Sequence, residues 1–350
     1  MTATLNTTII QNASSSTPNI TLDTAGNALF GGMPYGASSF LRNRIINGSM
    51  NIDQRNAGAS QTITAAAALA YTVDRWYAYC TGANITGQRV TSSGTTASPS
   101  QYAYQFTGAA SVTAIGFAQR IEAANSYDLA GSTATLSVNL SNSVLTTVTW
   151  TAYYANTADT FGTLASPTVT QIATGTFTVT STLTRYSTNI SIPSAATTGI
   201  QILFTVGAQT SGTWTIGNVQ LEAGSVATPF ERRQFGGELI LCYRYYTLVN
   251  GNAASIWFGT GYTAASTAAY FYLQFPIQMR VVPTTSFSST STFQVLVIST
   301  SFSVSTISTN ALSSQSMIIG TTISGATANL PVVLRDAGSA NSFISIAAEL

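Results

Sequence analysis

Three glutamates, Glu222, Glu231 and Glu238, could supply the paired carboxyl groups that cleave a glycosidic bond. That reaction needs two carboxyl groups about 5 to 10 Å apart on either side of a sugar chain. Glu231 is followed directly by two arginines, and Glu238 opens a segment with helical spacing, where a carboxylate complements the helix dipole. These neighbours favour structural roles for the glutamates and leave a polysaccharide depolymerase as the alternative.

The sequence offers few residues or motifs for other kinds of catalysis. Histidine is absent from the 350 residues, so a Ser-His-Asp triad cannot be assembled within the chain. The sequence also has no nucleophile elbow, phosphate loop or metal-ligand cluster. We therefore expect a binding protein and not an enzyme, with no catalytic residue, metal or cofactor.

Aromatic residues make up 10% of the chain and gather in short clusters. Aromatic rings stack on sugar faces, while amides and hydroxyls bond to sugar hydroxyls. Four residues of the C-terminal part are the candidates for a weak glycan site: Trp257, Tyr262, Tyr270 and Tyr272. The alternative is that each cluster belongs to a hydrophobic core or to an interface between copies.

Charged residues are scarce, at 7% of the chain, and the twelve basic residues are all arginine. The stretch 281–334 has no charge, and serine and threonine take the place of the usual charged side chains. Such neutral strand surfaces suit coverage by neighbouring copies, so we expect a homo-oligomer. The net charge of +1 gives no basic footprint for nucleic acid. Cys80 and Cys242 are expected to be buried free thiols.

Two charged motifs are predicted to pair with each other: Asp74-Arg75-Trp76 and Gln119-Arg120-Ile121-Glu122. A planar guanidinium can bridge carboxylates, and ligand recognition is the alternative. Truncation of Arg120 would then strand a carboxylate at a cost of about 3 to 5 kcal/mol. Structural ion-pair roles are also predicted for Glu222, Glu231 and Arg232.

The elements that position these residues are short strands with alternating apolar and polar side chains. Three such runs are Leu136/Val138/Leu140, Val148/Trp150/Ala152/Tyr154 and Ile200/Ile202/Phe204/Val206, and similar runs recur after residue 270. This period of two over many segments indicates antiparallel sheets with one buried face. The fold class is therefore all-β, with two antiparallel β-sandwich domains of jelly-roll type preceded by an extended N-terminal arm.

Composition and spacing divide the chain into four parts. Residues 1–41 form an attachment arm, within which 19–27 alternates and ends in a turn. Residues 42–235 form the jelly-roll sandwich, 236–250 a short helix or connector, and 251–350 a C-terminal sandwich. No window approaches the roughly 20 consecutive apolar residues of a membrane-spanning helix, so no membrane insertion is expected.

Several ordered blocks between residues 42 and 350 resemble bacteriophage tail-fibre and virion appendage proteins. They are Asn43–Arg55, Tyr71–Trp76, Gln119–Glu122, Val219–Gly224, Ala227–Arg233, Glu238–Tyr246, Met279–Pro283 and Ala347–Leu350. The resemblance implies a virion fibre or decoration, commonly trimeric, whose distal part meets the host surface.

On this basis we expect a homotrimeric tail fibre that adheres to a host-surface glycan and joins other virion proteins through its N-terminal arm. Its location would be the virion, in the tail or another external appendage. The rival within the family is a capsid or neck decoration protein without a receptor role.

A second resemblance concerns the first domain. Ile45–Met50 and Trp214–Leu221 look like the first and last strands of jelly-roll carbohydrate-binding modules. Those modules are implied to hold a structural calcium ion with acidic residues. This chain has Asn51 and Asn218 at the matching positions, where hard cations prefer carboxylates.

Overall fold

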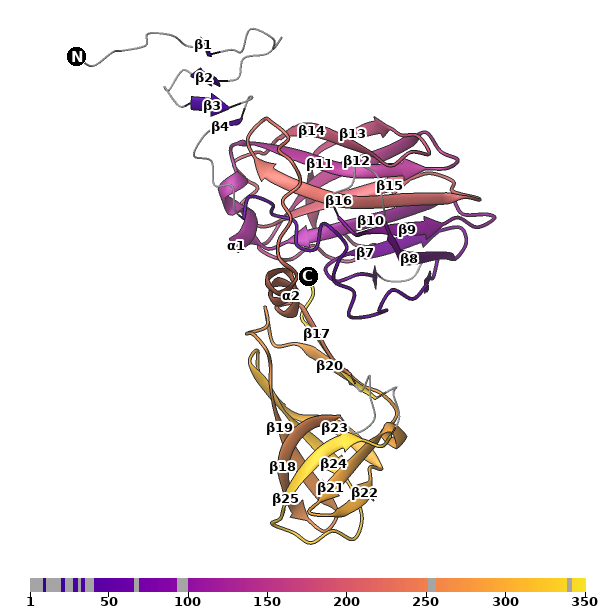
Figure 1. Ribbon diagram of the computed structural model, residues 1–350, viewed down its shortest axis with the longest axis vertical. Helices are drawn as coiled ribbons and strands as arrows, with labels where there is room; N and C mark the ends of the chain where they lie inside the picture. Colours follow the sequence, from indigo (N-terminus) through magenta and orange to yellow (C-terminus); the bar gives the residue numbers. More distant parts are fainter. Residues whose placement is uncertain are drawn as a thin grey trace, which may run out of the picture. The chain divides into compact units, whose positions relative to one another are not determined.

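The computed structural model describes strand residues 9–10, 20–22, 28–30 and 33–34, and residues 41–65, 69–92, 100–250, 256–338 and 342–350 (Figure 1). Nearly all of its regular structure is antiparallel strand, which confirms the predicted all-β class. The chain forms two compact units. The first unit comprises Met1–Asn51, Ser60–Ala70 and Tyr77–Arg232, and the second comprises Ile52–Ala59, Tyr71–Trp76 and Arg233–Leu350.

The N-terminal region contains a four-stranded antiparallel meander of β1 (Ile9–Ile10), β2 (Ile20–Leu22), β3 (Ala28–Phe30) and β4 (Met33–Pro34). β2 and β3 pair with Ile20 opposite Phe30, on either side of the turn predicted at the end of 19–27. The rest of the predicted arm lies outside the described residues.

The first unit contains two six-stranded sheets. One sheet has the order β13 (Val169–Thr178), β12 (Thr147–Ala155), β15 (Ile200–Val206), β10 (Ala114–Ile121), β7 (Tyr77–Thr81) and β6 (Ala70–Tyr71). The other has the order β14 (Thr184–Ser191), β11 (Thr133–Asn142), β16 (Thr213–Ala223), β9 (Tyr102–Thr107), β8 (Ile85–Thr91) and β5 (Gln61–Ile63). Most successive strands lie in different sheets, as in a jelly roll, while β6 and β7, β8 and β9, and β12 and β13 are neighbours within one sheet.

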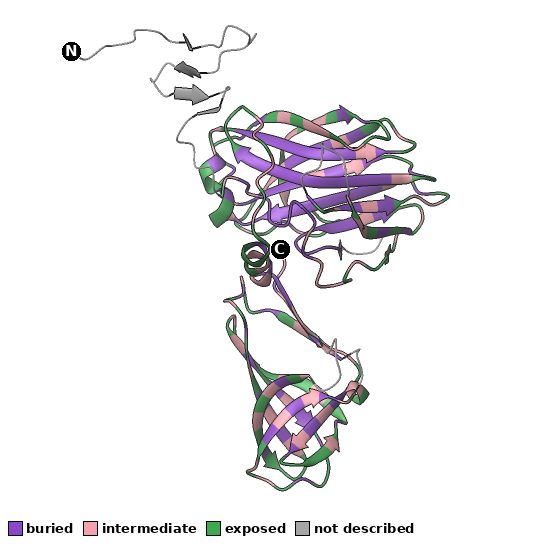
Figure 2. Cartoon of the chain, in the orientation of Figure 1, coloured by how far each residue is buried: buried purple, intermediate pink, exposed green. Residues whose placement is uncertain are grey.

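The predicted alternation of apolar and polar side chains locates the hydrophobic core of the first unit. The inward residues of β11, β12 and β15 are buried, which Figure 2 shows as purple bands along the strands. Phe106 and Trp214, from β9 and β16, stack within the core with ring centroids 5.1 Å apart. Between β10 and β11 the chain forms α1 (Ala123–Ser126) and the short 3-10 helix η1 (Tyr127–Leu129).

The second unit contains α2 (Phe235–Tyr243) and two sheets. A three-stranded sheet has the order β17 (Tyr246–Asn250), β26 (Phe343–Ala347) and β20 (Thr284–Phe287), which is followed by the 3-10 helix η2 (Thr290–Thr292). A seven-stranded sheet has the order β22 (Thr300–Ser303), β21 (Phe293–Val297), β25 (Pro331–Asp336), β18 (Trp257–Ala265), β19 (Ala268–Gln274), β24 (Ser316–Thr322) and β23 (Thr306–Leu312).

The seven-stranded sheet curls so that its two edge strands approach each other where the chain passes from one to the other. Its edge strands, β22 and β23, are consecutive in the chain, and only Val304 and Ser305 lie between them. Three peptide steps reach at most about 10 Å, so the first and last strands of the sheet must be neighbours. The inner face encloses the core of the unit, which includes Phe271, Val295 and Ile344. The outer face is left available for binding.

The two units differ from the predicted domain boundaries at two short segments. Ile52–Ala59 and Tyr71–Trp76, expected in the first sandwich, belong to the second unit. The reason is hydrogen bonding over long sequence distances: Gln54 Nε2 donates to the carbonyl of Tyr246, and the Tyr71 hydroxyl donates to the carbonyl of Leu350. The predicted connector is likewise part of this unit, because β17 pairs with β26.

Candidate functional site

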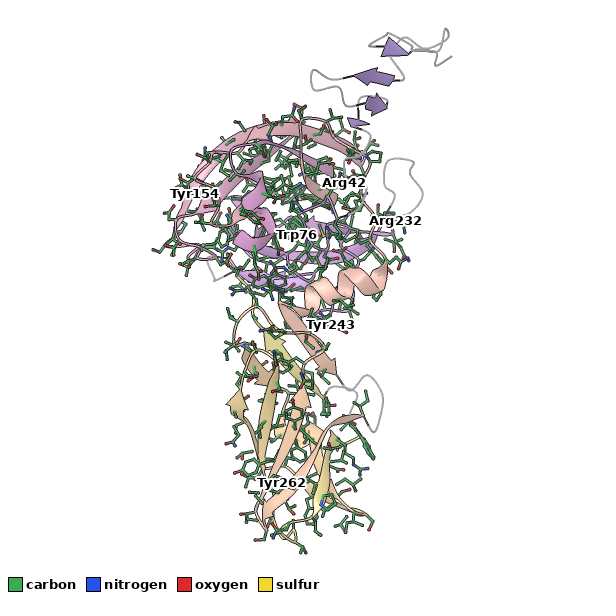
Figure 3. All side chains as sticks on the ribbon, turned by 90° about the vertical axis from the view of Figure 1, so that its left-hand side faces the viewer. Arg42, Trp76, Tyr154, Arg232, Tyr243 and Tyr262 are labelled. Atoms are coloured by element: carbon green, nitrogen blue, oxygen red, sulfur yellow. The ribbon has the colours of Figure 1, made fainter. Side chains whose placement is uncertain are left out.

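The hairpin of β18 and β19 places three tyrosines on the outer face of the seven-stranded sheet. Tyr262 and Tyr270 are directly opposite each other, with ring centroids 6.0 Å apart, and Tyr272 lies two residues further along β19. Tyr262 is 53% exposed and Tyr272 is 54% exposed. Phe271 alternates with Tyr270 and Tyr272 along β19 and belongs to the core, as does Phe258 at the β-bulge of β18. We name Tyr262, Tyr270 and Tyr272 the tyrosine face (Figure 3 labels Tyr262).

The next strand, β24, places a glycine beneath one of the rings of the tyrosine face. Gly320 lies opposite Tyr270, and a β-carbon added to it would be 3.4 Å from Cε1 of the tyrosine ring. The ring therefore rests against a strand position that has no side chain. Beside it, Ile318 lies opposite Tyr272 and is 37% exposed.

Polar groups border the tyrosine face. The Tyr272 hydroxyl donates a hydrogen bond to Oε1 of Gln274, and Thr260 is exposed opposite Tyr272. Ser308 and Asn310 are exposed on the following strand, β23. The arrangement combines aromatic rings with neutral donors and acceptors, which is the chemistry of sugar recognition.

Trp257, the fourth predicted residue, lies apart from the three tyrosines. It is 61% exposed at the start of β18, opposite Arg335 of β25, and a β-bulge separates it from Gly259. The structure thus brings three of the four candidates together and places Trp257 at the other end of the same strand.

The first unit has a second tyrosine-bearing sheet face, formed by β7, β10, β12 and β15. The ring of Tyr79 covers Gly116, at which an added β-carbon would be 2.1 Å from Cε1 of the ring. Burial raises the pKa of Tyr79, and nearby Tyr153 adds to the effect. Burial also raises the pKa of Tyr77 to about 12, although the Arg120 guanidinium opposes this shift.

Sequence reasoning did not assign this face, although the alternation of Tyr77 and Tyr79 was visible. The missing information was the register that sets Gly116 beneath Tyr79. An isolated glycine within a strand is the signal that could have located it, since it marks a place where another group approaches closely.

Arg120 donates hydrogen bonds to two neutral groups. It donates from Nε to Oε1 of Gln201 at 3.1 Å and from Nη2 to the carbonyl of Gly162 at 3.0 Å, and its guanidinium lies near Tyr77 and Phe161. Glu122 is buried at the N-cap of α1. In the second unit, Asp74 forms an ion pair with Arg55, and Arg75 forms one with Glu349.

Asp74, Arg55, Arg75 and Glu349 form a buried charge cluster in the second unit. Asp74 accepts hydrogen bonds from the backbone N–H and side-chain amide of Gln54, and lies 3.6 Å from Nη1 of Arg55. Arg55 also binds Glu349 at 3.1 Å, and Arg75 binds the other oxygen of Glu349.

Tyrosine rings complete the charge cluster. The guanidinium carbon of Arg55 lies 3.6 Å from the ring centroid of Tyr246, and that of Arg75 lies 3.4 Å from the centroid of Tyr245. Burial raises the pKa of Asp74 to about 6, even though Arg55 and Gln54 act in the opposite direction. A cavity of about 430 Å³ adjoins Arg55, Tyr246 and Glu349.

The three glutamates considered for catalysis are held by structural partners. Glu222 is buried and accepts hydrogen bonds from the Thr228 backbone and from Gln220, with Arg42 at 3.6 Å. Glu231 accepts the backbone N–H groups of Leu41 and Asn43, and Glu238 pairs with Arg233 at 3.3 Å in the first turn of α2.

Arg232 does not form the ion pair predicted for it. It is exposed and has no acidic partner within the described residues (Figure 3). Its neighbour Glu231 turns the other way, toward the backbone at Leu41 and Asn43, because adjacent residues of an extended segment point to opposite sides.

The described residues contain no group of three or more aspartate, glutamate or cysteine side chains able to hold an ion. Asn51 and Asn218 offer neutral amide oxygens in place of carboxylates, and so supply less negative charge than calcium prefers. Cys80 and Cys242 are buried and free, as predicted. No helix in the described ranges has both the length and the apolar character to span a membrane.

Comparison with known proteins gives structural neighbours only. No protein-family model and no curated protein matches the chain. The enzymatically active domain of tailspike protein 4 from bacteriophage CBA120 aligns with a TM-score of 0.35 and 17% identity, over 52% of this chain and 22% of that one. The chain thus spans less than a quarter of that neighbour's length.

Two carbohydrate-binding modules also align. TmCBM61, solved with β-1,4-galactotriose, gives a TM-score of 0.34 and 12% identity over 52% of this chain and 99% of that one. The family 11 module of a Clostridium thermocellum cellulase gives 0.28 and 12% over 50% and 100%. At such low similarity, function has to come from the side chains of this protein.

Proposed function

We propose that this protein binds glycans through the tyrosine face of its second unit. The observation that carries the proposal is the exposure of Tyr262 and Tyr272 beside the ring of Tyr270, on a strand pair whose two phenylalanines, Phe258 and Phe271, are buried. Exposed aromatic surface of this kind is costly in water unless it serves an interaction. Neutral amides and hydroxyls at its border suit the hydroxyl groups of a sugar.

The biological setting that we propose is the outside of a virion. The ordered motifs shared with phage appendage proteins support a fibre whose N-terminal residues attach to other virion proteins. The scarcity of charge supports close packing of copies into a homotrimer. Three or more equivalent weak sites would then give useful avidity, since linked sites bind far more tightly than single ones.

We propose adhesion without cleavage. The carboxyl groups of Glu222, Glu231 and Glu238 are each engaged by backbone N–H groups or arginine, which supports structural roles for them. Incubation of the protein with glycans that it binds should release no reducing ends. Release of reducing ends would favour the depolymerase.

Retention on insoluble bacterial envelope polysaccharides tests the binding function. The wild-type chain should be retained, and the Tyr262→Ala/Tyr270→Ala variant should be recovered in the unbound fraction. Tyr127→Ala is the matched control, because Tyr127 is 62% exposed but belongs to the first unit. Equal retention of both variants would remove the tyrosine face as the site.

Two further measurements test the setting. Light scattering on the purified chain should give the mass of three subunits, and a stable monomer would contradict the trimer. Immunogold labelling of virions should mark the tail. Labelling at capsid vertices or the neck would instead support a decoration protein.

A further inference from the structure

The strands of the seven-stranded sheet contain only two charged residues, Arg335 and Asp336, adjacent on β25. Strand alternation separates them. Asp336 points inward, is 2% exposed, and accepts hydrogen bonds from the Gly338 backbone and the Ser342 hydroxyl. Arg335 is on the outer face, and is the sole formal charge that these strands present there.

The contacts of Arg335 are all with neutral groups. Its Nη2 donates to the Ser301 hydroxyl at 2.8 Å and to Oε1 of Gln294 at 3.3 Å, and its Nε is buried without a hydrogen bond. No carboxylate pairs with it in the described part of the chain, whereas five other arginines have such a partner. A half-buried guanidinium without a counter-charge is ready to bind an anion.

Trp257 is directly opposite Arg335 in the register of β18 and β25. Cross-strand neighbours have β-carbons about 5 Å apart, so one small ligand can touch both side chains. The indole is 61% exposed, and its ring is not covered by the guanidinium. The pair therefore offers a flat apolar surface next to a positive charge.

We propose that Trp257 and Arg335 form a subsite for a sugar ring that carries an anionic substituent, either a carboxylate or a phosphate. The ring stacks on the indole, and the anion accepts hydrogen bonds from the guanidinium, which Gln294 and Ser301 hold in place. This inference rests on the proposed glycan binding, because the subsite shares β18 with the tyrosine face. Tyr262 lies five residue steps along the strand from Trp257, about 16 Å, so an oligosaccharide is needed to reach both.

An array of neutral, uronate-bearing, sialate-bearing and phosphate-bearing glycans tests the subsite. The wild-type chain should favour anionic glycans. Arg335→Gln, which retains donors for Gln294 and Ser301, should lose at least about tenfold in affinity for them and keep its affinity for neutral glycans. Arg335→Lys should restore part of the loss, and Trp257→Ala should weaken binding of the same anionic glycans.

The salt dependence of glycan affinity distinguishes an electrostatic role of Arg335 from a structural one. Affinity for anionic glycans should fall with added salt in the wild-type chain and less so in Arg335→Gln, since salt screens exposed charges. Thermal unfolding should be the same for both proteins. Comparison of the carboxylate-bearing and phosphate-bearing glycans on the array decides which anion is bound.

The outcomes distinguish the two proposals. Absence of binding to any glycan would overturn glycan binding itself, and this subsite with it. Binding of neutral glycans alone, or an unchanged array pattern in Arg335→Gln, would overturn the Trp257–Arg335 subsite and leave the tyrosine face intact.

Discussion

The ring of Tyr270 rests on Gly320, its partner in the neighbouring strand. An added β-carbon at Gly320 would be 3.4 Å from the ring, a normal contact distance. A glycine beneath an aromatic ring lets the ring lie close to the sheet, and the neighbouring Tyr262 ring then borders it at 6.0 Å. In the first unit, the ring of Tyr79 lies closer still to Gly116, where an added β-carbon would be 2.1 Å from the ring.

Substitution of Gly320 should therefore change glycan affinity according to side-chain size. Gly320→Ala should have little effect, because its methyl group fits beneath the ring. Gly320→Val should displace the ring and weaken binding about five- to tenfold, in line with about 1 kcal/mol for lost aromatic stacking. Calorimetric titration of both variants with a bound glycan checks this. Equal glycan affinities of the two variants would contradict the view that Gly320 sets the position of the Tyr270 ring.

Asp74 should make stability depend on pH. Its pKa is about 6 in the folded protein and 3.8 ordinarily, so the folded state binds the extra proton between these values. This contribution is complete below about pH 4 and is lost as pH rises through about 6. It corresponds to at most about 3 kcal/mol. Denaturant unfolding between pH 4 and 7 measures it.

Asp74→Asn should flatten this part of the pH dependence. Asp128→Asn is the control, because Asp128 is 43% exposed and pairs with Arg44 in the first unit. That variant should keep the fall in stability between pH 4 and 6. A wild-type curve that rises over this range would show that burial does not dominate at Asp74.

Removal of Arg55 should destabilise the second unit strongly at alkaline pH. Arg55→Met removes the Arg55 cation from buried Asp74 and removes one of the two arginine partners of Glu349. The loss in free energy of unfolding should be about 3 to 5 kcal/mol at pH 8. The cost should be smaller at pH 5, because Arg55 lowers the pKa of Asp74 and its loss favours the neutral acid. Unfolding at the two pH values tests this.

Arg44→Met is the matched control for the Arg55 variant. Arg44 pairs with Asp128 near the surface, with side-chain exposures of 26% and 43%. Exposed pairs contribute about 0 to 1 kcal/mol. If the Arg55 and Arg44 variants unfolded alike, the charge cluster would have no special role in stability.

The sequence predicts the strands well because alternation reflects local burial. Leu136, Val138 and Leu140 are buried as expected, as are Phe293, Val295 and Val297. The membership of Ile52–Ala59 and Tyr71–Trp76 in the second unit was not predictable from this alternation. The contacts of Gln54 with the Tyr246 region join residues 192 positions apart, and no local pattern records them.

The candidate site was predictable in part for the same reason. Tyr262, Tyr270 and Tyr272 alternate with buried residues, so their shared face follows from the period of two. The partners of Asp74 and Arg75 did not follow, because Arg55 and Glu349 lie in separate segments of the chain. Arg335 was also missed as a binding residue, since its importance depends on the inward orientation of Asp336 and on Trp257 opposite it.

Calorimetric titration with a glycan retained by the wild-type chain is the most direct test of the tyrosine face. Affinity should fall about tenfold or more in each of Tyr262→Ala, Tyr270→Ala and Tyr272→Ala, and should be unchanged in Tyr127→Ala, with all four variants folded. Unchanged affinity in the first three variants would contradict the assignment of glycan binding to this face.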